Sequence, residues 1–146
     1  MNGYDALKLE NQLCFPLYAA AKEVVKKYKP YLDAIELTYT QYLVMMALWE
    51  NSPLSVKALG ERLYLDSGTL TPLLKKLEKT NRITRTRSEN DERNVIVSLT
   101  KRGARLREQA VGIPEKIRGC INLSAEDARM LYALLHKILK ADGGIR

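Results

Sequence analysis

The segment LSVKALGERLYLDSGTLTPLLKKLEKTNRITRTRSENDERNVIVSLT (Leu54–Thr100) decides the fold of this chain. Its first half predicts two short helices, because Ser55 and Asp66 are good N-cap residues and each follows a leucine that can pack against the first helical turns. Only Tyr64 and Leu65 separate the two helices. The second helix has an apolar stripe of Leu70, Leu73, Leu74 and Leu77 and a polar, basic outer face. This arrangement is typical of a helix-turn-helix.

The second half of the segment changes to the period of a β-strand. Ile83–Arg87 alternates, Val95–Leu99 is β-branched and apolar, and the polar turn Ser88–Asn94 separates them, so we expect a hairpin. A helix-turn-helix followed directly by a basic hairpin is a winged helix, a mainly α (α+β) fold. In such a fold the second helix enters the DNA major groove, and the hairpin reaches a minor groove or the backbone.

Positive charge is concentrated beside the second helix. Residues 75–107 contain eleven Lys and Arg against four Asp and Glu, a surplus equal to the formal net charge of +7 of the whole chain. Taken alone, this run would also fit a solvated surface of mixed charge. Together with the motif it predicts DNA binding.

Helices are also predicted before the winged unit. Apolar residues recur at three- and four-residue steps over residues 5–29 and predict one long helix, which Lys29-Pro30 should end. Thr38 and Gln41 form a capping box that opens a second helix, apolar nearly all round. This second helix is therefore expected at the centre of the fold.

The chain after the hairpin is predicted to be helical as well. Thr100 should begin a helix that Gly112 and Pro114 kink, and Ser124 should cap the last helix. The flanking helices carry more apolar surface than one small core needs. Such surface usually meets a second copy of the chain.

We therefore expect one domain over residues 1–146. Residues 37–100 form its winged-helix DNA-binding unit, and residues 1–36 and 101–146 form its dimerisation region. A two-fold homodimer would place two reading helices roughly 34 Å apart on a palindromic double-stranded DNA site. The alternative is a monomer with a helical cap.

Several other classes of protein are disfavoured. The first residues are polar and no apolar run approaches the length of a membrane span, so we expect a cytoplasmic protein without membrane contact. No nucleophile–base pair, acidic pair or Gly-rich phosphate loop is visible, so the sequence predicts no enzyme, and neither a cofactor nor a metal site is expected. The lone histidine, His136, has no partner at ligand spacing.

Three segments carry a resemblance to a known family. They are LKLENQLCFPLY (Leu7–Tyr18), TYTQYL (Thr38–Leu43) and LYLDSGTLTPLLKKLE (Leu63–Glu78), and the wing adds Asp91-Glu92-Arg93. The chain resembles MarR-type repressors, and within them the organic hydroperoxide resistance type. The resemblance implies a homodimer that blocks a promoter until an organic hydroperoxide oxidises one cysteine.

The resemblance also implies site residues. The redox-sensing site would be Cys14 with Tyr28 and Tyr39, whose hydroxyls donate hydrogen bonds to the thiolate. Asp91 would orient Arg93 toward a minor groove. Lys76 departs from relatives that carry Arg, which puts a bidentate contact in doubt. The DNA-binding residues are expected to be Ser67, Thr69, Thr71, Lys75, Lys76, Arg85, Arg87, Asp91 and Arg93.

Cys14 allows two interpretations from its sequence alone. It could be a buried small hydrophobe, or a reactive thiol activated by tertiary contacts, since the predicted helix places it too deep for the helix dipole to act strongly. Tyr28 lies fourteen residues further along the same predicted helix, roughly 21 Å along its axis. A shared site must therefore span the dimer.

Cys120 is either a spectator or a resolving cysteine that attacks oxidised Cys14 of the other subunit. Three alternative functions remain open beside the peroxide-sensing repressor. They are a repressor released by a small aromatic ligand, a thiol peroxidase, and a protein-interaction module built on the winged fold.

Overall fold

The computed structural model describes residues 3–91 and 93–141. Within them, two 3-10 turns (Asp5–Leu7 and Leu9–Asn11) precede a mainly helical fold with one small sheet. The elements are α1 (Cys14–Asp33), α2 (Tyr39–Glu50), β1 (Leu54–Ser55), α3 (Val56–Leu63), α4 (Ser67–Lys79), β2 (Ile83–Arg87), β3 (Val95–Leu99), α5 (Lys101–Ala110), α6 (Ile113–Cys120) and α7 (Ala125–Ala141). The predicted fold class, a mainly α winged helix, is confirmed.

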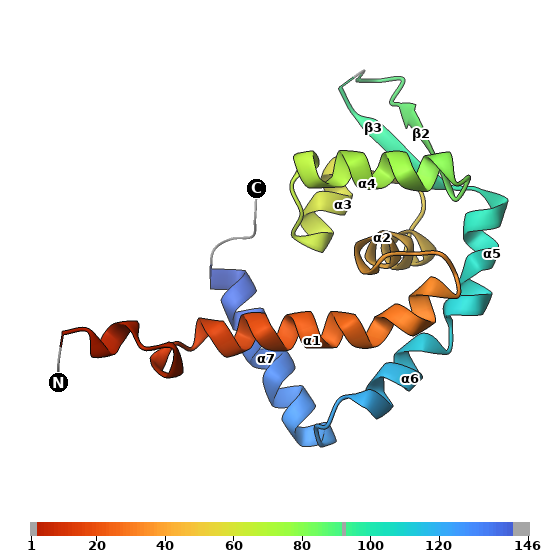
Figure 1. Cartoon of the computed structure of the whole chain (residues 1–146). Helices are drawn as coiled ribbons and strands as arrows, with labels where there is room; N and C mark the ends of the chain where they lie inside the picture. Colours follow the sequence, from red (N-terminus) through yellow and green to blue (C-terminus); the bar gives the residue numbers. More distant parts are fainter. Residues whose placement is uncertain (1–2, 92, 142–146) are drawn as a thin grey trace.

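Helix α2 is the centre of the core. Figure 1 shows it nearly end-on, with α1, α3, α4 and α5 around it. Val44 and Met45 are completely buried, because this helix has no polar face. The predicted capping box is confirmed: the Thr38 hydroxyl accepts a hydrogen bond from the Gln41 backbone, and the Gln41 side chain accepts one from the Thr38 backbone.

The helix-turn-helix forms as its caps predict. The Ser55 hydroxyl accepts a bond from the Ala58 backbone N–H at 3.0 Å, and the Asp66 carboxylate accepts one from the Thr69 backbone N–H at 2.7 Å. Tyr64 closes α3 in the left-handed region with φ 55°. A Cβ on Gly60 would lie 2.7 Å from the Leu65 carbonyl oxygen, so the tight turn needs glycine there.

The wing is the predicted antiparallel hairpin, with Ile83 opposite Leu99 and Arg87 opposite Val95. The sheet order is β1-β3-β2, so a third strand pairs with the hairpin, Leu54 opposite Val97. This strand was not predicted, because two residues are too short to show a period.

The N-terminal helix differs from the prediction. Residues 5–11 form two 3-10 turns, and α1 starts only at Cys14. The Asn11 and Gln12 side-chain amides donate to the backbone carbonyls of Asp5 and Ala6 at 2.7 and 2.6 Å, and so compete with helical bonds. Pro16 reinforces this start, because a proline without N–H is tolerated in the first turn of a helix.

The predicted stop at Lys29-Pro30 was also wrong. Pro30 lies inside α1, which continues to Asp33. Leu32, only 2% exposed, packs into the core in this last turn, and Lys29 forms an ion pair with Asp33 at 2.9 Å. Packing of the last turn outweighs the one backbone hydrogen bond that proline removes.

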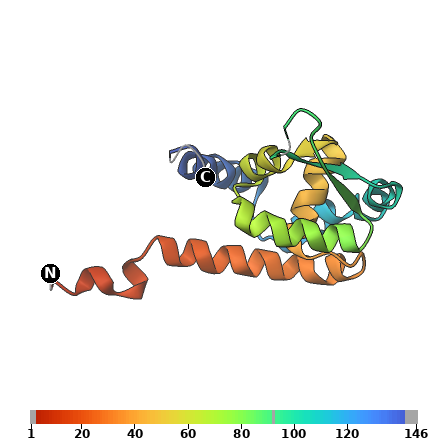
Figure 2. The same ribbon diagram turned by 90° about the horizontal axis from the view of Figure 1, so that it is seen from above.

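The C-terminal helices follow the prediction more closely. Thr100 caps α5, the chain breaks at Gly112, and Ser124 caps α7 through the Asp127 backbone N–H at 3.0 Å. The break separates two helices, α5 and α6, rather than kinking one. Figure 2 shows α7 and the N-terminal half of α1 extending beyond the winged unit. Residues 1–2 and 142–146 of the expected dimerisation region lie outside the described residues.

None of the helices in the described ranges is long and apolar enough to cross a membrane.

Candidate functional site

The outer face of α4 is polar and exposed. Ser67, Thr69, Lys75 and Lys76 are exposed, whereas Leu70, Leu74 and Leu77 of the same helix are buried in the core and Leu73 is half-buried against it. Thr71 is half-buried, and its hydroxyl donates to the Ser67 carbonyl at 2.8 Å. The packing of the leucines thus fixes which side chains α4 presents to a partner.

The β2–β3 wing extends past α4 (Figure 1). The Asp91 carboxylate accepts a hydrogen bond from the Arg93 backbone N–H at 3.0 Å and lies 3.6 Å from Arg93 Nε. The Arg93 side chain is 94% exposed. Arg87, at the end of β2, is exposed as well. Asp91 therefore fixes the backbone of Arg93, while the Arg93 guanidinium group is exposed to solvent. Glu92 lies outside the described residues.

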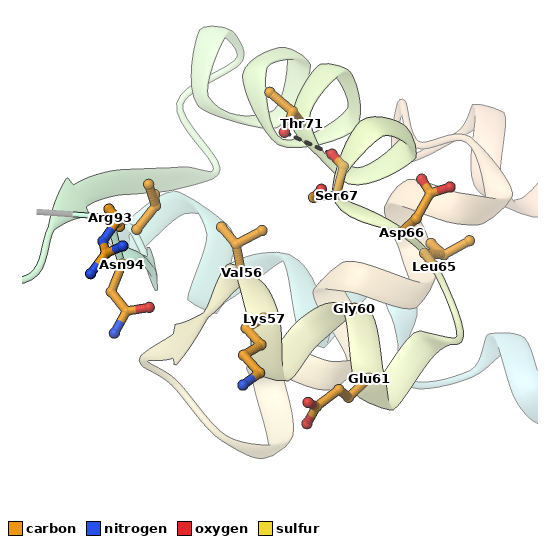
Figure 3. A pocket seen from close by; sticks show the side chains of 11 residues that line it. Val56, Lys57, Gly60, Glu61, Leu65, Asp66, Ser67, Thr71, Arg93 and Asn94 are labelled. Carbon is orange, nitrogen blue, oxygen red and sulfur yellow. Dashed lines mark hydrogen bonds between the residues drawn. The ribbon is translucent and has the colours of Figure 1, made fainter. Parts of the chain in front are cut away.

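A hollow of about 510 Å³ lies between α3, α4 and the wing. Figure 3 shows Ser67 and Thr71 on the α4 side of this hollow and Arg93 and Asn94 on the wing side. Lys57 of α3 also lines it. The sequence analysis missed Asn94 and Lys57, because only the folded chain brings α3 and the wing together.

Arg85 differs from the other predicted DNA-binding residues. Its Nε and Nη2 lie 3.3 and 3.0 Å from Glu78 Oε1, and its backbone N–H donates to Glu78 Oε2. This contact lowers the pKa of the Glu78 carboxyl below its ordinary value. Arg85 therefore ties β2 to α4, and a partner would have to compete with Glu78 for it.

Cys14 is the first residue of α1, and it is exposed. The expectation that it lies deep within a helix was wrong, because the helix starts nine residues later than the pattern predicted. The interpretation of Cys14 as a buried small hydrophobic residue is also wrong for the single chain. Exposed apolar side chains surround it in sequence, among them Leu13 at 82% and Phe15 at 45%.

Tyr28 and Tyr39 lie side by side, as a shared site requires. Their ring centroids are 4.9 Å apart, and Tyr42 joins them at 5.8 and 6.4 Å. Burial raises the pKa of Tyr28 and of Tyr39, so both phenols stay protonated and available as donors. Cys14 of the same chain is not part of this cluster, because α1 is continuous between Cys14 and Tyr28, about 21 Å by helical rise.

Cys120 is the last residue of α6 and is exposed. It lies beside Tyr31 of α1, and the pKa of the Tyr31 phenol is raised chiefly by its electrostatic interaction with Cys120 and then by a side-chain hydrogen bond to Cys120. Lys116, one turn earlier on α6, places its Nζ 5.3 Å from the centre of the Tyr31 ring. The sequence analysis missed Tyr31, since only the packing of α6 on α1 brings it to Cys120.

Two apolar surfaces of the single chain are exposed. One runs from the N-terminal turns along α1, and the other covers α7. Their large exposed side chains are Tyr4, Leu7, Leu9, Leu13, Phe15, Leu17, Tyr18 and Val25 on the first, and Met130, Leu131, Tyr132, Leu134 and Ile138 on the second. Apolar surface on this scale is characteristic of a protein interface.

Comparison with known proteins gives one consistent result. A family model described as transcriptional regulator SarA/Rot matches residues 26–109. The chain is 54% identical over 139 residues to the organic hydroperoxide resistance transcriptional regulator of Bacillus subtilis (strain 168), and the match covers 95% of each protein.

Solved structures agree with this result. Reduced AbfR bound to DNA is 34% identical, with a TM-score of 0.77 and coverage of 94% of this chain and 97% of AbfR, a protein of Staphylococcus epidermidis. Its disulfide form matches with a TM-score of 0.67 at the same identity, covering 94% of this chain and 93% of that one.

Proposed function

This chain belongs to the MarR-type family of organic hydroperoxide resistance regulators, and we propose that it represses transcription by binding operator DNA until a hydroperoxide oxidises Cys14. The observation that supports this most is the position of Cys14: an exposed thiol at the first residue of α1, inside an apolar surface.

DNA recognition is assigned to α4 and the wing. Ser67, Thr69 and Lys76 of α4 would face the major groove, and Arg93 would reach the neighbouring minor groove. The hollow between α4 and the wing would receive the sugar–phosphate backbone, with Lys57 and Asn94 on its walls. The AbfR structure on DNA supports this assignment, since the folds match closely.

Dimerisation is assigned to the two exposed apolar surfaces. Pairing of α1 and α7 with their copies would remove these side chains from water, and at about 25 cal/mol per Å² it would supply a large favourable term. A two-fold arrangement brings a second α4 into register on a palindromic site. The same pairing would bring Cys14 of one subunit to Tyr28 and Tyr39 of the other.

The sensing reaction follows from these placements. The Cys14 thiolate attacks the terminal peroxide oxygen, the O–O bond breaks, and the alkoxide leaves and takes a proton from water to become an alcohol. The sulfur becomes a sulfenic acid. The loss of negative charge and the added oxygen alter a subunit contact, which changes the spacing of the two α4 helices.

Operator binding with and without cumene hydroperoxide tests this proposal. Wild type should release DNA on oxidation, whereas Cys14→Ser should bind DNA normally and stay bound. Cys120→Ser is the matched control and should still release DNA. Equal release by wild type and Cys14→Ser would reject the proposal.

A second candidate is release by a small aromatic ligand. A cavity of about 420 Å³ between α2 and the α5–α6 region favours it, because Tyr42, Met46 and Trp49 line it and Arg107 could pair with a carboxylate. Salicylate should then release the Cys14→Ser variant from DNA without any oxidant. Failure to do so at millimolar concentration would exclude this ligand class.

A further inference from the structure

The ends of α1 and α4 lie on the same side of the molecule, next to α5 (Figure 1). Each of the two helices is followed by a residue in the left-handed region, Glu36 after α1 with φ 55° and Asn81 after α4 with φ 61°. The backbone N–H after each of these residues bonds back to a carbonyl in the last helical turn at 3.0 Å. This is the bond of a Schellman motif, so both helices end in a fixed backbone conformation.

The side chain of Arg82 joins the two helix ends. Arg82 comes directly after Asn81, and its Nη2 donates to the carbonyl of Ile35, the residue before Glu36, at 3.1 Å. The same Nη2 lies 3.8 Å from Glu36 Oε2. Only 4% of the Arg82 surface is exposed. The carbonyl ends of both helices carry partial negative charge, which favours a cation at this position in spite of its burial.

Arg82 is also held at the start of α5. Its carbonyl accepts a hydrogen bond from the Thr100 backbone N–H at 3.1 Å, and the Thr100 hydroxyl donates to the Asn81 carbonyl at 2.7 Å. Gly103 lets α5 approach closely, because a Cβ there would lie 1.9 Å from the Arg82 carbonyl oxygen. Any displacement of Arg82 must therefore be shared by α4 and by the start of α5.

The burial of Arg82 is unfavourable in itself. Its Nε is buried and has no hydrogen-bond partner among the described residues. An unpaired buried donor loses its bonds to water without replacement, and apolar side chains often replace buried charged groups at no loss of stability. We therefore expect the contact with Ile35 to add little to the stability of the fold. Its effect is to fix the end of α1 relative to the end of α4.

We propose that Arg82 is a positioning residue that transmits the oxidation of Cys14 to the reading helix α4. This inference rests on the proposed function. Because α1 is continuous from Cys14 through Tyr28 to Asp33, a displacement at the subunit contact also moves its far end. The bond between Ile35 and Arg82 then carries this displacement to α4. Arg82 itself is too deeply buried to contact DNA, so it acts only through the helices that it joins.

Arg82→Met in the full chain tests the proposal, because methionine is unbranched and adaptable but has no donor for the Ile35 carbonyl. Reduced Arg82→Met should bind operator DNA as wild type does and should oxidise at Cys14 at the wild-type rate, measured by fluorescence anisotropy and mass spectrometry. After complete oxidation, wild type should release the operator, whereas Arg82→Met should stay bound. The ratio of the oxidised to the reduced Kd, which measures the coupling, should be about tenfold smaller than in wild type or less.

Ile83→Val is the matched control. Ile83 is the neighbour of Arg82 and only 1% exposed, and the substitution removes one methylene group from the core without removing the bond to Ile35. Its Kd ratio should therefore stay that of wild type, even though its Tm falls. Arg82→Lys, which keeps a cationic donor, should recover part of the ratio. A purely structural role would instead make the ratio follow the Tm in all three variants.

Trp49 supplies a second readout that needs no DNA. It is the single tryptophan of the chain, and its indole N–H donates to the Gly103 carbonyl at 2.8 Å, where α5 approaches Arg82. The emission of Trp49 should change when wild type is oxidised and should stay constant when Arg82→Met is oxidised.

The outcomes separate this inference from the proposed function. If Arg82→Met does not fold, Arg82→Gln, whose shorter amide falls short of Ile35, takes its place. Equal release of the operator by oxidised wild type and by the folded variant overturns the inference and leaves peroxide sensing in place. Constant Trp49 emission in oxidised wild type overturns it as well. Failure of oxidised wild type to release DNA would reject the proposed function instead.

Discussion

Cys14 and Tyr28 stand on one uninterrupted helix, fourteen positions apart, which separates their backbones by about 21 Å. A tyrosine hydroxyl extends roughly 6 to 7 Å from its Cα atom. Tyr28 therefore cannot donate a hydrogen bond to Cys14 of its own chain. If these residues form one sensing site, each site must combine the cysteine of one subunit with the tyrosines of the other.

Mixed dimers test this arrangement directly. A dimer of one Cys14→Ser subunit and one Tyr28→Phe subunit keeps one Cys14, and across the interface this cysteine meets an intact Tyr28. We expect it to oxidise at the wild-type rate per site. Loss of one hydrogen bond of about 1 kcal/mol should slow oxidation roughly fivefold in Tyr28→Phe homodimers.

The matched control places both substitutions on the same subunit, opposite a wild-type partner. Its remaining Cys14 then meets Phe across the interface and should oxidise slowly. Mass spectrometry of tagged subunits measures both rates. The reverse order of the two rates would show that the site lies within one chain.

Cys120 cannot reach Cys14 of its own chain, so a disulfide between the two residues would have to join two subunits. Cys120 lies beside Tyr31, seventeen positions after Cys14 on α1, so the two sulfurs of one chain are far apart. Stoichiometric cumene hydroperoxide should therefore yield a Cys14–Cys120 disulfide between subunits, seen as a dimer on a non-reducing gel and lost in Cys120→Ser. A stable sulfenic acid, or only mixed disulfides with added small thiol, would make Cys120 a spectator.

Local signals in the sequence predicted the capped helices well. Five residues accept a hydrogen bond from the backbone N–H three positions later: Thr38, Ser55, Asp66, Thr100 and Ser124. This interaction involves only neighbouring residues. The apolar stripe of α4 and the hairpin were predicted for the same reason, since their periods are local.

The predictions from sequence were wrong where local patterns and tertiary packing favour different structures. Apolar spacing over residues 5–13 suggested a helix, but side-chain amides bond the backbone there, and the apolar residues remain exposed in the single chain. Pro30 was predicted to end the first helix, because the local sequence does not show that Leu32 is buried in the core. The contact of Tyr31 with Cys120 and the unpaired Nε of Arg82 depend entirely on packing between distant elements.

Arg93 and Arg85 should respond differently to substitution. Arg93 is almost fully exposed at the wing, so Arg93→Ala should weaken operator binding by about 1–3 kcal/mol without changing the Tm. Arg85 is tied to Glu78, so Arg85→Gln should lower the free energy of unfolding by less than about 1 kcal/mol and leave DNA affinity near that of wild type. Fluorescence anisotropy with operator DNA and thermal melts measure both. An equal loss of affinity in the two variants would mean that DNA displaces Glu78.

Gly103 and Gly119 form a matched pair of helical glycines. A Cβ at Gly103 would lie 1.9 Å from the Arg82 carbonyl oxygen, whereas a Cβ at Gly119 would meet no atom within 4 Å. Gly103→Ala should therefore cost about 4 kcal/mol or more, because α5 must move off the sheet. Gly119→Ala should stabilise the protein by about 0.5–1 kcal/mol, since alanine is the better helix former. Urea denaturation measures both, and similar midpoints for the two variants would contradict the close approach of α5.

The cap of α4 should make stability sensitive to acid. Hydrogen bonds from Thr69 lower the pKa of Asp66 below its ordinary value of 3.8. A carboxyl with a lowered pKa in the folded state contributes stability that is complete above its ordinary value and is lost as the pH falls through the folded value. Asp66→Ser keeps an N-cap acceptor but does not titrate. Between pH 7 and pH 3, the Tm of wild type should therefore fall further than the Tm of Asp66→Ser. The plots of Tm against pH for the two proteins should converge below pH 4. Since the Glu78 carboxyl titrates in both proteins, its effect cancels, and parallel profiles would show that the Asp66 cap does not depend on its charge.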